Sequence, residues 1–193
     1  LMKRLSLYLF LILFTLQTPS LADDIRDFEI EGISIGDSLL DYVSKKEINN
    51  NLATYYKDNK YSSFQVYKNK GSFKIKQYDH MVITFKTSDS KFKIVGVSGI
   101  IWHQKTINQC YQDMKEVISD ISEILINVSP TKIRTIDTHH GKNTYSRFNL
   151  TSGDVISVQC TDYDSKHKNY WDHLRITTDT DEFLIWIETE AYK

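Results

Sequence analysis

Two short segments carry the residue types of a serine hydrolase. Gly36-Asp37-Ser38-Leu39 presents a serine beside an acid, and Asp137-Thr138-His139-His140 places an Asp and a His three residues apart. In such an enzyme His140 would accept the proton of Ser38 as the hydroxyl attacks an ester, and Asp137 would orient the imidazole. Helix starts also prefer residues such as Asp37 and Ser38, so capping a helix is an alternative role that needs no catalysis.

The Ser38 segment, with Ile33-Ser34-Ile35 before it, resembles the nucleophile block of the GDSL (SGNH) hydrolases. The resemblance implies a serine esterase on a parallel sheet, with Ser38, Asp137 and His140 in the catalytic roles. The blocks that build that family's oxyanion hole, an isolated glycine and a glycine-x-asparagine-aspartate string, have no counterpart here. About fifty residues also follow His140, whereas the family's acid and base come just before its final helix. We therefore expect a protein without catalytic activity, with the GDSL-type esterase as an alternative.

A group of acids and histidines offers ligands for a metal ion. Its members lie in and after one predicted strand, with a separate histidine pair earlier in the chain: Asp162, Asp164, His167, Asp172 and His173, and His139 with His140. Carboxylates and imidazoles are common ligands of divalent cations. Their spacing matches no established ligand pattern, and polar residues around a hairpin are usually solvated. We expect no metal and no other cofactor, and keep a metal-binding periplasmic protein as a second alternative.

The segment from Lys57 to Lys93 is basic and rich in aromatic residues, with nine lysines against three aspartates. A sheet face of this kind could bind an anionic component of the cell envelope, and Lys74, Lys76 and Tyr78 are the candidate ligand-binding residues. Lysines that alternate with apolar residues are also what any sheet with one solvated face requires. Beyond residue 22 the chain has 22 basic and 25 acidic residues, so nucleic acid is not an expected partner.

The two cysteines, Cys110 and Cys160, are predicted to form a disulfide. Cys110 lies on the apolar stripe of a predicted helix that starts with a capping box at Thr106 and ends near Asn127, and Cys160 shares one face of a predicted strand with Ile156 and Val158. Both sulfur atoms point into the same layer if this helix covers this strand. An even number of cysteines in an exported chain favours pairing.

The first 22 residues have the features of a signal peptide. Lys3 and Arg4 precede the apolar run from Leu5 to Leu16, and Ala22 ends a segment suited to cleavage before Asp23. The apolar run is too short to span a bilayer comfortably and no similar run follows, so we expect no transmembrane anchor. The sequence thus predicts a soluble exported protein, in the periplasm or secreted.

Residues 23–193 are predicted to form a single α+β domain, in which antiparallel β-meanders pack against the long amphipathic helix. The patterns predict strands over residues 25–31, 64–67, 73–78, 81–86, 92–102, 145–150, 155–161 and 174–178. One short helix is predicted after Asp37 or Ser38. A second begins with a capping box at Ser44 and runs through Tyr55, and a closing helix is predicted to begin with Asp179 as its cap. The chain then divides into two candidate helix-plus-sheet halves, 23–103 and 104–193.

The block from Asp27 to Tyr42 resembles the opening of exported proteins of small-genome marine bacteria, a group that brings no known activity. The resemblance implies export and no particular chemistry. From all these features we expect an exported binding or envelope-associated protein. Its partner would be an anionic envelope component or another protein.

Overall fold

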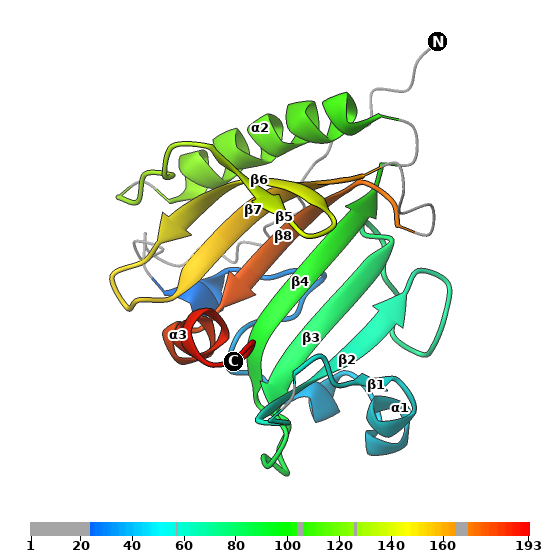
Figure 1. The fold of residues 1–193 in the computed structure, drawn as a ribbon. Helices are drawn as coiled ribbons and strands as arrows, with labels where there is room; N and C mark the ends of the chain where they lie inside the picture. Colours follow the sequence, from blue (N-terminus) through cyan, green and yellow to red (C-terminus); the bar gives the residue numbers. More distant parts are fainter. Residues whose placement is uncertain (1–23, 57, 104–105, 126, 165–169) are drawn as a thin grey trace.

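The computed structural model shows an eight-stranded antiparallel sheet with three α-helices (Figure 1). It describes residues 24–56, 58–103, 106–125, 127–164 and 170–193. The strands are β1 (Leu52–Ala53), β2 (Tyr61–Tyr67), β3 (His80–Lys86), β4 (Ile94–Trp102), β5 (Arg134–Thr138), β6 (Gly141–Asn149), β7 (Val155–Tyr163) and β8 (His173–Asp179). Their order in space is β1-β2-β3-β4-β8-β7-β6-β5. The α+β class and the antiparallel sheet are confirmed, whereas the predicted signal peptide lies outside the described residues.

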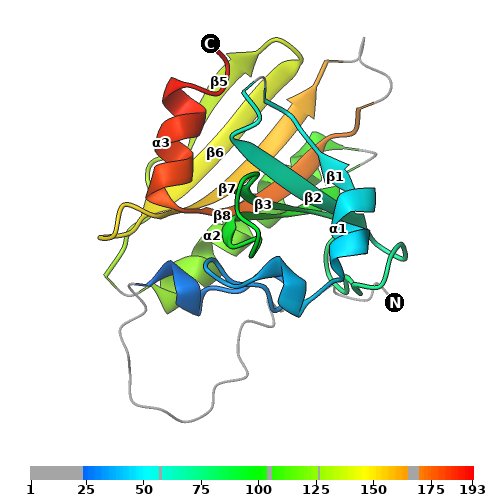
Figure 2. The ribbon, with the colours of Figure 1, turned by 90° about the horizontal axis from the view of Figure 1, so that it is seen from below.

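The two faces of the sheet are covered by different parts of the chain. Helix α2 (Ile107–Ile124) and the N-terminal segment lie on one face, and α3 (Asp181–Thr189) lies on the other (Figures 1 and 2). We call these the α2 face and the α3 face. Side chains alternate along a strand, so in β7 Ile156 and Val158 point to the α2 face, and Ser157 and Gln159 point to the α3 face.

The α2 face holds the main hydrophobic core. Helix α2 packs on β7 and β8 and buries Cys110, Met114, Val117 and Ile121. Its 18 residues span about 27 Å, which is enough to cross several strands. Among the described residues, no helix is long and apolar enough to cross a membrane.

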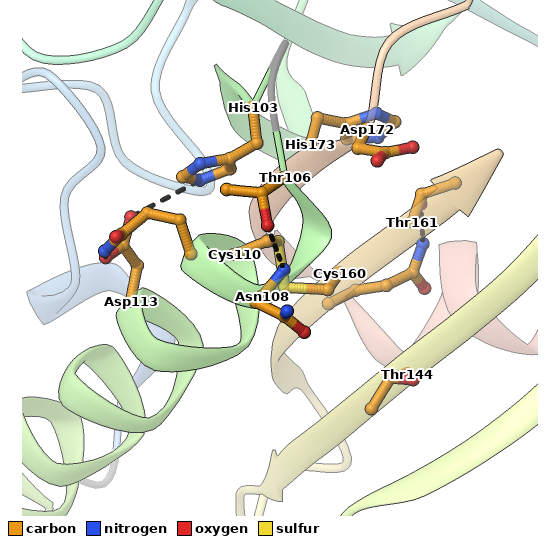
Figure 3. The surroundings of a disulfide bond; sticks show 12 residues. His103, Thr106, Asn108, Cys110, Asp113, Thr144, Cys160, Thr161, Asp172 and His173 are labelled. Carbon is orange, nitrogen blue, oxygen red and sulfur yellow. Dashed lines mark hydrogen bonds and ion pairs between the residues drawn. A yellow bond between two sulfur atoms is a disulfide. The ribbon is translucent and has the colours of Figure 1, made fainter.

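A disulfide between Cys110 and Cys160 fixes α2 to β7, as predicted (Figure 3). The two Cα atoms are 6.0 Å apart and 50 residues separate the cysteines in sequence. Close to this bond, His103, which follows β4, points to α2, with its Nε2 3.3 Å from Oδ2 of Asp113. The first turns of α2 therefore make two contacts with the sheet, the disulfide to β7 and the His103–Asp113 contact to the end of β4.

The N-terminal segment folds back on itself where the sequence predicts a strand over residues 25–31. Residues Ile25–Asp27 form a 3₁₀ helix, and Ile30 pairs with Ile33 across a tight turn. Glu31 and Gly32 both have positive φ angles, 55° and 78°, which a strand does not permit. The strand prediction is wrong because the alternating apolar residues belong to a tight turn. The turn buries Ile30 and Ile33 on the α2 face.

The two predicted N-terminal helices are present but short. Ser38 caps a 3₁₀ helix, Leu39–Asp41, and Ser44 caps α1 (Lys45–Asn50), accepting the Glu47 backbone N–H at 3.3 Å. Glu47 does not complete the capping box, because its carboxylate accepts the backbone N–H of Ser72 at 2.7 Å. Helix α1 ends at Asn50, and the next residues form β1, an edge strand that the sequence patterns do not predict.

The predicted strand over residues 73–78 is wrong. This segment is a loop, in which Oε1 of Glu31 accepts the backbone N–H groups of Lys76 and Gln77 at 2.9 and 2.5 Å. The alternating pattern arises because the loop buries Ile75 and Tyr78 in the main core. Strand pairing is unnecessary here because a carboxylate satisfies the backbone donors.

Helix α3 forms a second, smaller core on the α3 face. Phe183 and Trp186 pack against Tyr61 of β2, and Trp186 is 1% exposed. Thr180 caps this helix by accepting the Phe183 backbone N–H at 3.4 Å, so the prediction of Asp179 as the cap is wrong by one residue. The nine residues of α3 span about 14 Å, so the helix covers one end of the sheet.

The disulfide should contribute strongly to stability. Replacing both cysteines by alanine removes a crosslink that closes a 50-residue loop, and should lower the free energy of unfolding by about 4 kcal/mol. Urea denaturation of the oxidised protein and of the double variant measures this difference. Equal midpoints would contradict the assignment, and an intact mass two hydrogens below the dithiol value is the control for oxidation.

Candidate functional site

The structure does not bring the predicted hydrolase triad together. Ser38 lies beside the start of β4, where it pairs with Lys93, and His140 lies in the turn between β5 and β6. That turn is at the other end of the sheet, since Gly141 pairs with the last residue of β7 and Gly96 with the last of β8. A nine-residue strand is about 30 Å long, so the serine and the imidazole are separated by the length of the sheet.

The side chains of Asp37 and Ser38 stabilise the local turn. Ser38 Oγ donates to the carbonyl oxygen of Lys91 at 2.7 Å and accepts the Leu40 backbone N–H at 3.2 Å. Asp37 accepts the Ser34 backbone N–H at 3.1 Å and the hydroxyl of Tyr42. The third predicted member, Asp137, is exposed on β5. The capping role therefore accounts for the bonds of this segment.

The candidate ligand-binding residues lie on the α2 side of the molecule. Lys74 and Lys76 are exposed in the loop that follows β2, and Lys74 Nζ donates to the carbonyl oxygen of Gly71 at 3.3 Å. Tyr78 is buried, with its ring against Gly99, where an added Cβ would lie 2.4 Å from it. Burial raises the pKa of the Tyr78 hydroxyl. Tyr78 is thus a core residue, and the two lysines form no common face with it.

The candidate metal ligands are spread over both faces and the strand ends. Asp162 points to the α2 face, and Asp172 Oδ1 accepts the Tyr163 backbone N–H at 2.9 Å. His173 Nδ1 lies 3.1 Å from the carbonyl oxygen of Trp171. Within the described ranges, no three His, Cys, Asp or Glu side chains are grouped as metal ligands would be. His167 lies outside the described residues.

A cleft of about 590 Å³ lies between the N-terminal segment and the start of α3. Its charged lining residues are Asp24, Arg26, Lys86, Asp89, Lys93, Asp154 and Glu182. Arg26 pairs with Asp24, and Lys86 Nζ lies 2.8 Å from Oε2 of Glu182. Asp89 accepts the backbone N–H groups of Lys91 and Lys93. Most of these charges thus have partners within the protein, and they are exposed.

A chain of aromatic rings crosses the far end of the α3 face, away from α3. Tyr67 stacks on His80 with ring centroids 4.2 Å apart and planes 3° apart, and His80 stacks on Trp102 at 6.1 Å. The contacts continue through β8 and β7 to the β5–β6 turn. In order, the rings of this aromatic chain are Tyr67, His80, Trp102, His173, Tyr163, Tyr170 and His140. Trp171 joins it through an edge contact with Trp102 at 5.9 Å.

The outer rings of this chain are open to solvent, and its inner imidazoles are not. Tyr67, Tyr170 and Trp171 are 42%, 52% and 48% exposed, whereas His80 and His173 are 6% and 4% exposed. Neither ring nitrogen of His80 has a hydrogen-bond partner among the described residues. A buried polar atom without a partner is unfavourable and is therefore a mark of a functional or incomplete site.

The strand register places one side chain from each of seven strands in a line across the α3 face. This transverse row consists of Tyr67, His80, Ile100, Arg175, Gln159, Tyr145 and Arg134, from β2 to β5. Arg175 lies at its middle and is half-buried. Among the described residues the guanidinium has no ion-pair or hydrogen-bond partner, and its Nε is buried.

Burial and the Arg175 charge together set the protonation of this face. Burial, with a smaller effect of Arg175, lowers the pKa of both His80 and His173 to about 4. Both imidazoles are therefore neutral at pH 7. Burial raises the pKa of Asp179, at the α3 end of the same strand, to about 7, although Arg175 and Arg147 favour its charged form.

No protein-family model, no curated protein and no solved structure matches this chain.

The sequence patterns do not predict Arg175 and His80 as site residues, although one local feature distinguishes Arg175. It stands between Leu174 and Ile176, so it alternates with core residues in a strand and must point to the opposite face. His80 has no such mark, because it begins its strand next to Asp79. The juxtaposition of His80 and Arg175 depends on a register between segments 95 residues apart in the sequence.

Ser38 should matter for stability and not for catalysis. Replacing Ser38 by alanine removes a cap and should lower the free energy of unfolding by about 1 kcal/mol. Thermal or urea denaturation measures this loss, with the exposed Ser90→Ala variant as a control. Because Ser38 Oγ donates to a carbonyl and bonds to no imidazole of the described residues, a fluorophosphonate probe should leave it unlabelled. An adduct on Ser38 would restore the esterase hypothesis.

Asp179 should make stability fall as pH rises. The folded pKa of about 7 exceeds the ordinary value of 3.8, so the folded state holds this proton more tightly and loses stability between about pH 4 and pH 7. Asp179→Asn removes this loss and should raise the free energy of unfolding by about 2 kcal/mol at pH 8, with little change at pH 4. His80 and His173 act in the opposite direction, but they are present in both proteins and cancel in the difference. A pH-independent difference between the two denaturation curves would contradict the raised pKa of Asp179.

Proposed function

We propose that this protein is exported and binds a partner on the α3 face of its sheet, without a catalytic step. The observation that carries the proposal is the aromatic chain, whose solvent-exposed tyrosines and tryptophan surround the buried imidazole of His80 and the guanidinium of Arg175, neither of which has a partner among the described residues. Tyr, Trp and Arg are the residues most enriched at the energetic centres of binding interfaces. A partner that covered this face would bury exposed rings and satisfy polar atoms in one event.

The α3 face is the less covered face of the sheet, which supports its role in binding. On the α2 face, the strands are covered by α2, the N-terminal segment and the loop before β3. On the α3 face, α3 covers the end of the sheet near Gly96 and Asp179, and the other end carries the aromatic chain. The unpartnered polar atoms there lie in a rigid sheet, which positions them before any partner arrives.

Export rests on two features. Residues 1–22 have the pattern of a signal peptide, and the disulfide suits an oxidising compartment. The proposal places the protein in the periplasm or outside the cell, associated with an envelope component or another protein.

We also propose that the protein consists of two helix-plus-sheet halves and that both contribute residues to the aromatic chain. Strands β1 to β4 form one half of the sheet and β5 to β8 the other, and they meet where β4 pairs with β8. Tyr67, His80 and Trp102 come from the first half, and His173 and Tyr163 come from the second. A partner on the aromatic chain would therefore contact both halves.

Site-specific photocrosslinking in cells that export the protein tests the binding face. A photoreactive phenylalanine analogue at Tyr67 or Trp171 should crosslink to one partner, because both rings are about half exposed on the α3 face. The same analogue at Leu40 and Leu52, which are 41% and 45% exposed and lie outside the aromatic chain, is the matched control. Adducts of equal yield at all four positions, or at the controls alone, would refute the binding face.

The same cells test export. The protein recovered from the periplasm or the medium should have a mass that begins at Asp23. Recovery of the uncleaved chain in the cytoplasm would refute the proposed location.

A further inference from the structure

We propose that Arg175 is an anion-binding residue of the α3 face, and that the carboxylate it binds belongs to an Asp or Glu side chain of a polypeptide partner. This inference rests on the proposed function and names the chemistry of the partner. It starts from the middle of the transverse row, where His80, Ile100 and Arg175 lie on three neighbouring strands. Adjacent strands are about 4.8 Å apart, so His80 and Arg175 flank Ile100 within one small area.

None of the carboxylates in the described part of the chain pairs with this guanidinium. Asp79 Oδ2 accepts the Trp102 backbone N–H at 3.0 Å, and Asp172 accepts the Tyr163 backbone N–H. Asp179 lies four residues along β8, at the end covered by α3, where its raised pKa keeps much of it uncharged near neutral pH. A half-buried arginine with a buried Nε and no partner has lost part of its hydration without replacement. An external carboxylate would provide the missing acceptor.

The local charge fits a single carboxylate. His80 and His173 are neutral at pH 7 and still have ring N–H groups, so Arg175 carries the charge at the centre of the row, whereas Arg134 lies at its β5 end and Lys70 over the Tyr67 ring at its other end. One positive charge neutralises one carboxylate, whereas a phosphate monoester with two negative charges would remain partly unneutralised. The planar guanidinium also matches the two oxygens of a carboxylate.

The surroundings favour a polypeptide over an acidic polysaccharide. On the β5 side of the row, Ile133 and Ile136 are 46% and 47% exposed, and Ile136 points to the α3 face next to Arg134. On the other side, the exposed rings of Tyr67 and Trp171 flank the row. Apolar side chains of a protein can bury both surfaces around a central acidic residue, which is the usual arrangement of interface centres. A polysaccharide has no side chains to cover exposed isoleucines.

NMR titration of the isotope-labelled protein with defined probes tests this assignment. The probes are acetylated, amidated pentapeptides, Gly-Leu-Glu-Leu-Gly and Gly-Leu-Gln-Leu-Gly, and trigalacturonate as the acidic sugar. The Glu peptide should bind at least tenfold more tightly than the Gln peptide and shift the Arg175 Nε–Hε resonance. Arg175→Gln should abolish this difference, and Arg175→Lys should retain part of it. Arg147→Gln is the matched control, because Arg147 already pairs with Glu188 at 2.8 Å and should not affect the preference.

Each other outcome overturns the inference in a defined way. Equal binding of the two peptides, or binding of neither, refutes Arg175 as a carboxylate site. Tighter binding of trigalacturonate than of the Glu peptide refutes the polypeptide partner. If Arg175→Gln leaves the crosslinks from Tyr67 and Trp171 unchanged, the binding face stands and the role of Arg175 fails. If those crosslinks never form in the unmodified background, the proposed function fails instead.

Discussion

The pairing of β4 with β8 is the constraint on which the rest of the structure depends. Seven residue pairs, from Gly96–Asp179 to Trp102–His173, join two strand groups that are otherwise connected through α2. This pairing turns two four-stranded units into one continuous sheet. It also fixes the register that aligns His80, Ile100 and Arg175, since a slip of one residue would turn Arg175 toward the core. The disulfide supports the same junction from the α2 face, where α2 packs on β7 and β8.

The sequence predicts those parts of the structure whose signals are local. The apolar stripe of α2 and the alternation in β7 predict that Cys110 and Cys160 share a layer, and they are bonded. Ser38 and Ser44 cap helices because a cap needs only its neighbouring residues. Alternation alone does not identify a strand, as residues 73–78 demonstrate: Ile75 and Tyr78 are buried there, but the carboxylate of Glu31, far away in sequence, replaces a partner strand.

The site is less predictable than the fold because it is made by the register of distant strands. Asp37, Ser38 and His140 are residue types that can form a catalytic triad. In the structure, Asp37 and Ser38 bond within a local turn, and His140 lies at the opposite end of the sheet. Edge strand β5 is exposed along its whole length, so it has no apolar alternation to reveal it. Without β5 and the β4–β8 register, the sequence gives no reason to place Arg134, Arg175 and His80 on one line.

The two faces of the sheet differ in how completely their polar groups are satisfied, and this difference follows from the lengths of the helices that cover them. On the α2 face, an 18-residue helix and the N-terminal segment bury apolar side chains, and the nearby carboxylate of Glu31 serves several backbone donors. On the α3 face, a nine-residue helix reaches only part of a strand that is about 30 Å long. The remaining part holds the neutral imidazole of His80 and the guanidinium of Arg175, neither of which has a partner among the described residues. A core would have selected apolar residues at these positions, because an unpaired polar group there reduces stability. The proposed partner would account for their presence in the rigid middle of the sheet, because it would supply the missing acceptors.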